Sequence, residues 1–116
     1  MCGIVGIHGP EAARVAAMNE AQRHRGPDGA GAFAAPAQGL TLAMRRLAIL
    51  DVAGGTQPMY AADGRFALVY NGEIMNAPEL RQALEAAGEV FTTDHSDTEV
   101  LLRLLVREGI DALPKL

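Results

Sequence analysis

The chain has 116 residues, of which 49% are hydrophobic and 21% are charged, and this length suits a single domain with one hydrophobic core. No segment approaches the roughly 20 continuous apolar residues of a membrane span, and a net charge of −4 with scattered basic residues argues against binding to nucleic acid. One cysteine excludes an internal disulfide, and because no secretion signal opens the chain, we expect a soluble, cytoplasmic protein.

The first half of the chain predicts a strand, a helix and a hairpin. Residues 2–7 are rich in β-branched side chains and indicate a buried strand, and residues 11–22 place alanines at helical spacing after a proline. Gly-Pro and Asp-Gly pairs predict a loop at residues 23–29. Strands are expected at residues 30–34 and 40–45, because a proline and a glycine separate them as in a hairpin with a longer loop.

The middle of the chain predicts a loop beside a functional site, followed by a strand. Residues 47–52 are apolar apart from one aspartate, and the glycines and the proline of residues 54–58 break any regular element. Residues 65–70 indicate the strand. It ends at Asn71-Gly72, a pair favoured where the backbone needs a positive φ, so we expect a sharp turn there.

Two helices are predicted in the last third of the chain, each beginning with a capping box. Asn76 and Glu79 form the first box, and Ser96 and Glu99 form the second. The second helix is expected over residues 97–108 and is covered on most sides. The succession of strands and helices indicates a layered α+β domain. Because the sequence ends on an apolar segment directly after a new element begins, we expect a piece of a longer chain.

Cys2 is the first candidate for chemistry. Removal of Met1 would make it the N-terminal residue, and its α-amine, with a reference pKa of about 7.7–8.0, can act as the general base for its own thiol. No separate histidine base is then required. The alternative is that Cys2 packs as a small hydrophobic residue at the start of a strand, which is the commoner role of a lone cysteine.

Other residues supply what attack on the amide of an amino acid needs. The oxyanion needs preorganised donors, and Asn71 and Gly72 offer a side-chain amide and a backbone N–H, although Asn-Gly alone is commonly just a turn. An amino-acid substrate also needs a cation and an acid, for which Arg46 and Asp97 are candidates. The alternatives are a solvated arginine at a strand end and a helix acid favoured by the helix dipole.

Metal and nucleotide sites are not predicted. The dispersed His8, His24 and His95, together with the one cysteine, lack the spacing of metal ligands. Residues 29–31 lack the rest of a dinucleotide-binding or Walker motif. We therefore expect neither a metal site nor an ATP site in this chain.

A series of motifs, in this order and spacing, resembles the class II (N-terminal cysteine) glutamine amidotransferases. Residues 24–28, His-Arg-Gly-Pro-Asp, resemble the asparagine synthetase branch, whereas related families usually have glutamine or tyrosine at Pro27. The resemblance covers the whole chain and implies an α+β fold of the N-terminal-nucleophile hydrolase type. That fold is a four-layer α/β/β/α sandwich, incomplete here, in which Cys2 starts a central strand. The motifs lie at residues 1–6, 23–28, 45–51, 55–59, 71–76 and 96–101.

The resemblance also implies a domain organisation and a reaction. Residues 1–116 would be the N-terminal part of the glutaminase domain, and the rest of that domain and an ATP-dependent synthetase domain would follow in the full-length protein. Cys2 would attack the side-chain amide of L-glutamine and release ammonia, and water would hydrolyse the γ-glutamyl thioester to glutamate. The ammonia would reach an aspartyl-adenylate, which requires ATP and Mg in the synthetase domain. The oligomeric state, monomer or homodimer, stays open.

The resemblance assigns further roles by position. Asn71 and Gly72 would form the oxyanion hole, and Arg46 would bind the substrate carboxylate. Glu73 and Asp97 would bind the substrate ammonium group. The remaining assignment is Arg25, which would support the loop of the site.

Two departures from the family leave the acceptor open. Met75 stands where an aromatic residue is usual, and Ala43-Met44 precede the arginines where a histidine is common. Amidotransferases of peptide, antibiotic or sugar pathways share this domain, so aspartate is one acceptor among several. Two further hypotheses are a truncated domain that binds glutamine or a partner without turnover, and a purely structural module.

Overall fold

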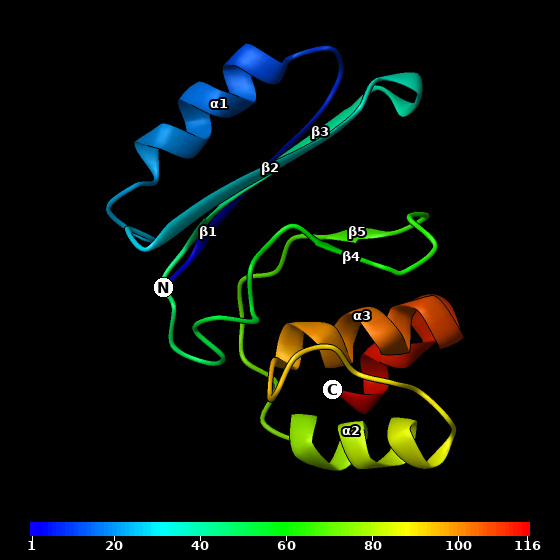
Figure 1. Ribbon diagram of the computed structural model, residues 1–116. Coiled ribbons are helices and arrows are strands. Elements are labelled where there is room, and N and C mark those ends of the chain that lie inside the picture. Colours follow the sequence, from blue (N-terminus) through cyan, green and yellow to red (C-terminus); the bar gives the residue numbers. More distant parts are fainter.

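The N-terminal half of the chain forms a three-stranded antiparallel sheet with one helix against it (Figure 1). The computed structural model describes residues 1–116, and the elements of this half are β1 (Gly3–His8), α1 (Ala12–Ala21), β2 (Gly29–Ala35), the 3-10 helix η1 (Pro36–Gln38) and β3 (Leu40–Arg46). The strand order is β1-β3-β2. The hairpin of β2 and β3 turns through η1, as the proline and the glycine between them predict.

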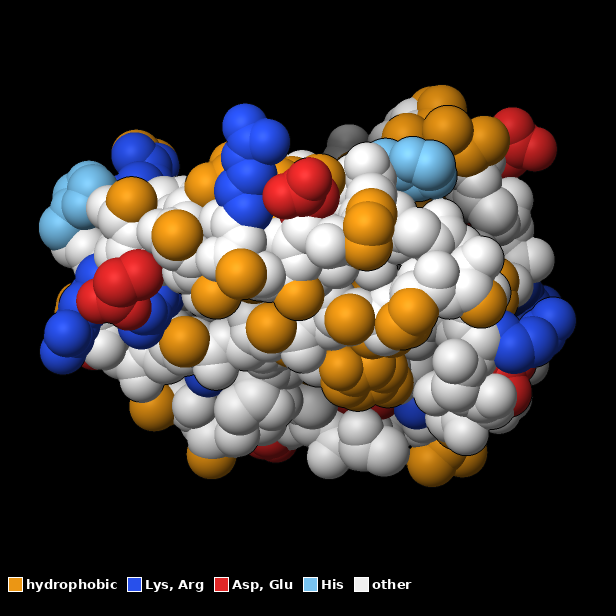
Figure 2. Space-filling model, turned by 90° about the horizontal axis from the view of Figure 1, so that it is seen from above, with side chains coloured by type: hydrophobic (Ala, Val, Ile, Leu, Met, Phe, Trp, Pro, Cys, Tyr) orange, Lys and Arg blue, Asp and Glu red, His pale blue; other side chains and the backbone are white.

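Helix α1 covers one face of this sheet, mainly over β1 and β3. Val15 of α1 packs with Val5 and Ala43, which are paired neighbours on adjacent strands and therefore lie on the same face. Seen from the side of α1, the hydrophobic side chains are scattered and mostly small (Figure 2). This surface is expected from the exposed alanines of α1 and β2.

The C-terminal half forms a helical layer on the other side of the molecule. Its elements are β4 (Met59–Tyr60), β5 (Ala67–Leu68), α2 (Ala77–Ala86), α3 (Asp97–Glu108) and the 3-10 helix η2 (Gly109–Lys115). The pair β4–β5 lies between the larger sheet and the two helices (Figure 1). None of the helices has the length and the apolar run that crossing a membrane requires. The larger core joins α2, α3 and η2 and comprises Ile74, Ala77, Leu84, Val100, Leu101, Leu104 and Ala112.

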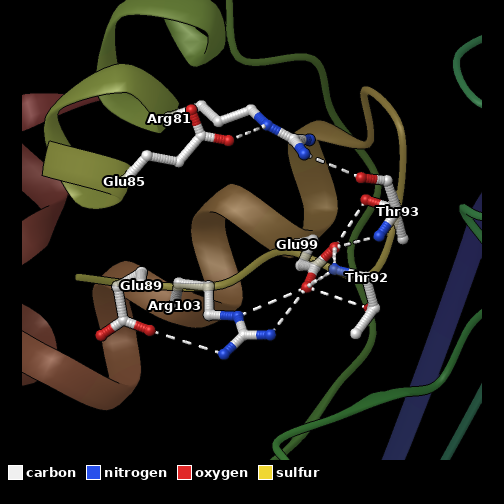
Figure 3. Close-up of polar contacts among 7 residues, drawn as sticks. All are labelled: Arg81, Glu85, Glu89, Thr92, Thr93, Glu99 and Arg103. Carbon is white, nitrogen blue, oxygen red and sulfur yellow. Dashed lines mark hydrogen bonds and ion pairs between the residues drawn. The ribbon is translucent and has the colours of Figure 1, made fainter.

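A buried carboxylate fixes the segment that leads into α3 (Figure 3). The side chain of Glu99 is only 3% exposed, and it accepts hydrogen bonds from the backbone N–H groups of Thr92 at 3.0 Å and Thr93 at 2.7 Å. Both threonine hydroxyls donate to it as well. Arg103, one turn later on α3, donates to the same carboxylate at 2.9 Å. Side-chain hydrogen bonds, rather than regular secondary structure, therefore hold this segment against α3.

The bounds of the hairpin and the three helices agree with the predictions, but the predicted capping boxes are wrong. No side-chain hydrogen bond caps α2 or α3. Asn76 instead donates to the carbonyl of Lys115 at 2.8 Å, and Glu99 binds Thr92 and Thr93 instead of the N-cap. The motif was misleading because both side chains have partners outside the four residues that define a capping box.

The predicted strands also need correction. The strand expected at residues 65–70 shortens to β5, because its partner β4 pairs over two residues only. Neither Asn71 nor Gly72 has a positive φ, so the expected left-handed turn does not form there. β1 is not buried on both faces, since Ile4 is 47% exposed, and it is an edge strand of its sheet rather than a central one.

Candidate active site

A cavity of about 350 Å³ lies where the start of β1, the end of β3 and the start of α3 meet. Its walls come from stretches that are far apart in the sequence. All the residues predicted to be catalytic or to bind substrate line this cavity: Cys2, Arg46, Asn71, Gly72, Glu73 and Asp97. The fold thus gathers in one place the residues that the sequence motifs singled out separately.

Cys2 lies half-buried in the cavity wall, directly before β1. The backbone N–H of Leu47 donates to its Sγ at 3.3 Å, and Sγ lies 3.6 Å from the Leu47 carbonyl. The backbone of Leu47 thus holds the sulfur in place in the cavity wall. Arg25 donates from Nε to the Cys2 carbonyl at 3.2 Å and so fixes the backbone of the nucleophile. Met1 also lines the cavity, so its removal would both free the α-amine and widen the site.

Arg46, the last residue of β3, is buried rather than solvated. Its guanidinium donates to three consecutive backbone carbonyls, those of Leu50 at 3.0 Å, Asp51 at 2.8 Å and Val52 at 2.9 Å. These bonds use both Nη atoms and leave Nε without a protein acceptor. The loop after β3 therefore sets the position of this cation in the cavity wall, which rejects the alternative of a solvated strand-end arginine.

Asp97, the first residue of α3, connects the helix to the segment with the predicted oxyanion donors. It is buried, and its Oδ2 accepts the backbone N–H of Ile74 at 3.1 Å, while the hydroxyl of Thr98 lies 3.3 Å from Oδ1. The residues just before Ile74, which are Asn71, Gly72 and Glu73, are exposed on the cavity wall. Asp97 therefore has a structural partner in addition to any ligand, and it holds this segment in place.

The charges around the cavity suit a zwitterion. Arg46 contributes a cation, and Asp97 and Glu73 contribute carboxylates. Burial raises the pKa of Tyr70, another residue of the wall, and the negative charges of Asp97 and Glu73 raise it further. The phenol therefore stays protonated and can donate a hydrogen bond. A cation and two anions around one cavity complement the carboxylate and ammonium groups of a free amino acid.

The sequence interpretation missed Gln57 as a residue that organises the cavity wall. Its Oε1 accepts the backbone N–H of Tyr70 at 2.6 Å, and its Nε2 lies 3.4 Å from the hydroxyl of Thr98. One side chain thus connects the segment after β5 to the start of α3. The signal was present, because Gln57 lies in one of the family motifs, but the breaker residues around it predicted only a loop.

The chain gathers no set of metal ligands. No group of three or more His, Cys, Asp or Glu side chains is placed so that it could hold a metal ion. Two of the three histidines have separate local partners: the ring of His24 contacts the Ala21 carbonyl, and the ring of His95 accepts the N–H of Asp51.

Comparisons with known proteins agree on one family. The family model described as a glutamine amidotransferase domain matches residues 1–116. The glutamine-hydrolysing asparagine synthetase 1 of Bacillus subtilis (strain 168) is 44% identical over 110 residues, which cover 88% of this chain and 17% of the relative. The glutamine-hydrolysing asparagine synthetase 1 of Arabidopsis thaliana is 37% identical, and the match covers 96% of this chain and 19% of the relative. The asparagine synthetase of Sandersonia aurantiaca is 38% identical over 94% of this chain and 21% of its own length. The chain thus spans about a fifth of the length of these relatives.

Proposed function

Because the chain belongs to the glutamine amidotransferase domain family, we propose that it is the glutaminase part of an amidotransferase and that Cys2 is its nucleophile. The observation that carries the proposal is the shared cavity, which Cys2, Arg46, Asn71, Glu73 and Asp97 all line. Family membership alone gives the class of reaction. The cavity supports the proposal because a thiol, a guanidinium, two carboxylates and a side-chain amide line the same space.

The reaction begins when the α-amine of Cys2, free after removal of Met1, takes the proton of its own thiol. Sγ attacks the side-chain carbonyl carbon of glutamine, and the side-chain amide of Asn71 and the N–H of Gly72 donate to the oxyanion. Collapse of this intermediate breaks the C–N bond, and the proton held by the amine leaves with ammonia. Water then attacks the γ-glutamyl thioester, which yields glutamate and restores the thiol of Cys2.

The substrate is held at its α-carbon. The guanidinium of Arg46 binds the carboxylate of glutamine, and Glu73 and Asp97 bind its ammonium group. Arg25 acts on the other side of the nucleophile, where its hydrogen bond to the Cys2 carbonyl keeps the N-terminus against the cavity. With its α-carbon held by these groups, glutamine would turn its side-chain amide toward the sulfur.

The remaining proposals concern the full-length protein. Residues 1–116 form the N-terminal part of a glutaminase domain that becomes a four-layer α/β/β/α sandwich when complete, and a synthetase domain follows in the same chain. Aspartate is the acceptor of the ammonia, since the relatives are asparagine synthetases by name. ATP and Mg act in the synthetase domain of the full-length protein, as the resemblance to asparagine synthetases implies. The protein works in the cytoplasm, as a monomer or a homodimer.

Mass spectrometry tests the proposal directly. We expect the mature chain to lack Met1 and to gain one covalent adduct when it is treated with a diazoketone analogue of glutamine. Because Cys2 is the only cysteine, the Cys2→Ala variant supplies an unambiguous control and should gain none. A chain that retains Met1, or an adduct that persists in Cys2→Ala, would contradict the proposed nucleophile. Glutamine binding without release of glutamate would instead support the non-catalytic alternative.

A further inference from the structure

A reciprocal pair of hydrogen bonds joins two walls of the cavity. The backbone N–H of Asp51 donates to Nε2 of His95 at 3.1 Å, and the backbone N–H of His95 lies 3.3 Å from Oδ2 of Asp51. The two residues are 44 positions apart in the sequence. Asp51 is buried and has a φ of +42°, a conformation that a non-glycine residue keeps only where its surroundings fix it. The Asp51–His95 pair is therefore a specific tertiary contact.

Each side of the pair carries part of the proposed glutamine site. The carbonyl of Asp51 accepts hydrogen bonds from the guanidinium of Arg46 and from the N–H of Gly55, both at 2.8 Å. On the other side, Asp97 follows His95 by two residues and begins α3. The Asp51–His95 pair thus fixes the distance between the proposed carboxylate-binding arginine and an ammonium-binding aspartate.

The contact requires a neutral ring. Nε2 of His95 accepts a hydrogen bond, so it carries no proton, and Nδ1 lies 2.9 Å from the carboxylate of Asp94, to which it donates. Charged groups face this arrangement from both sides: the carboxylates of Asp94 and Asp51, and the guanidinium of Arg46 beyond the Asp51 carbonyl. The ring is 59% exposed, so solvent reaches it. A proton on Nε2 would point one donor at another and break the bond to Asp51.

We propose that His95 is a positioning residue whose neutral ring holds the Arg46 wall of the cavity against the Asp97 wall, so that proton uptake by the ring weakens glutamine binding. The inference rests on the proposed function, because it assumes that the cavity binds glutamine. His95 is not among the residues that line the cavity. Its effect should therefore appear in the affinity for glutamine and in KM, and it should leave the reactivity of the Cys2 thiol unchanged.

The test is calorimetric titration of the full chain with glutamine from about pH 8 to about pH 5, the range in which histidine titrates. In a Cys2→Ala background, which prevents turnover, affinity should fall on acidification by about 2- to 10-fold, the equivalent of one net hydrogen bond. His95→Gln offers an uncharged acceptor and should remove this decrease. His95→Ala should bind glutamine weakly at every pH, and His8→Gln, at an exposed histidine outside the cavity, should behave like the parent.

The outcomes separate the two proposals. If His95→Gln shows the same decrease as the parent, or if His95→Ala binds as tightly as the parent, the role of His95 is refuted and the glutamine site stands. If no variant binds glutamine at any pH, the proposed function fails and the role of His95 fails with it. Nitrogen NMR of the ring provides an independent check, because the proposal requires the neutral form protonated at Nδ1 near neutral pH.

Discussion

Replacement of Glu99 by glutamine should destabilise the fold substantially, although Glu99 lies outside the candidate active site. Burial by itself would raise the pKa of this carboxyl group. The hydrogen bonds from Thr93, Thr92 and Arg103 outweigh that effect and lower the pKa from its ordinary value of 4.5 to about 2. The carboxylate receives four donors from the two threonines alone (Figure 3). A glutamine amide would turn an NH2 group toward donors that need an acceptor.

The magnitude follows from the lowered pKa. A tenfold change in proton affinity is worth about 1.4 kcal/mol, so the fall from 4.5 to about 2 corresponds to roughly 3 kcal/mol of stability. Because the folded-state pKa lies below the unfolded one, this contribution is complete above pH 4.5 and is lost as the pH falls toward 2. The Glu99→Gln variant should lack the contribution at neutral pH as well, at a cost of about 2–4 kcal/mol.

Urea unfolding followed by circular dichroism measures this effect, at neutral pH and again below pH 4.5. The matched control is Glu85→Gln, which removes a carboxylate that is 48% exposed and pairs with Arg81 at 3.0 Å on α2. Such a surface pair should contribute at most about 0.5 kcal/mol. The reasoning fails if Glu99→Gln costs no more than Glu85→Gln at neutral pH. It also fails if the variant loses stability in acid as steeply as the parent does.

Two further predictions concern the cavity wall. Arg46→Lys should weaken glutamine binding by about tenfold or more. A lysine ammonium cannot donate to three loop carbonyls and bind a carboxylate at the same time, as the planar guanidinium can. Equal affinity of the two proteins in a calorimetric titration would remove Arg46 from the site. The Tyr60→Phe variant leaves Tyr70 as the only tyrosine, and the ultraviolet absorbance of its phenolate should show that it ionises above pH 10. Because the pKa of Tyr70 is raised in the folded state, the free energy of unfolding should decrease as the pH rises above 10. An ordinary titration of Tyr70 would mean that neither burial nor the charges of Asp97 and Glu73 raise its pKa.

The helices were predictable because their signals are local. Helix α3 begins at Asp97 and ends at Glu108, as expected, since Ser96 before it and Gly109 after it interrupt the helical periodicity. The pairing of strands was not predictable in the same way. The position of β1 at the edge of its sheet depends on contacts with β3, which begins at Leu40, and no residue in β1 itself encodes them.

The same contrast between local signals and long-range contacts applies to the residues of the candidate site. Cys2 and Asn71 could be chosen from the sequence because chemistry restricts the residue types at a nucleophile and an oxyanion hole, and because the family resemblance outweighed their commoner structural roles. The roles of Gln57, Asp51 and His95 could not be inferred in this way, even though Gln57 and Asp51 lie within family motifs, because these roles depend on partners that the fold brings from distant positions. The pattern Ser96-x-x-Glu99 illustrates the difficulty: the residue types fit a capping box, yet the carboxylate is used by the two threonines of the preceding segment.

The buried carboxylate and the Asp51–His95 pair act on the same short segment. Glu99 fixes Thr92 and Thr93, and His95 follows two residues later, two residues before the start of α3. The segment is thus held at one end by the helix and at the other by the loop after β3. Because Arg46 binds that loop through its carbonyls, the cation and the acid of the cavity are positioned through a chain of hydrogen bonds across the two halves of the molecule. Glu99→Gln should therefore weaken glutamine binding even under conditions in which the chain is still folded. A loss of global stability alone would not explain such a decrease in affinity.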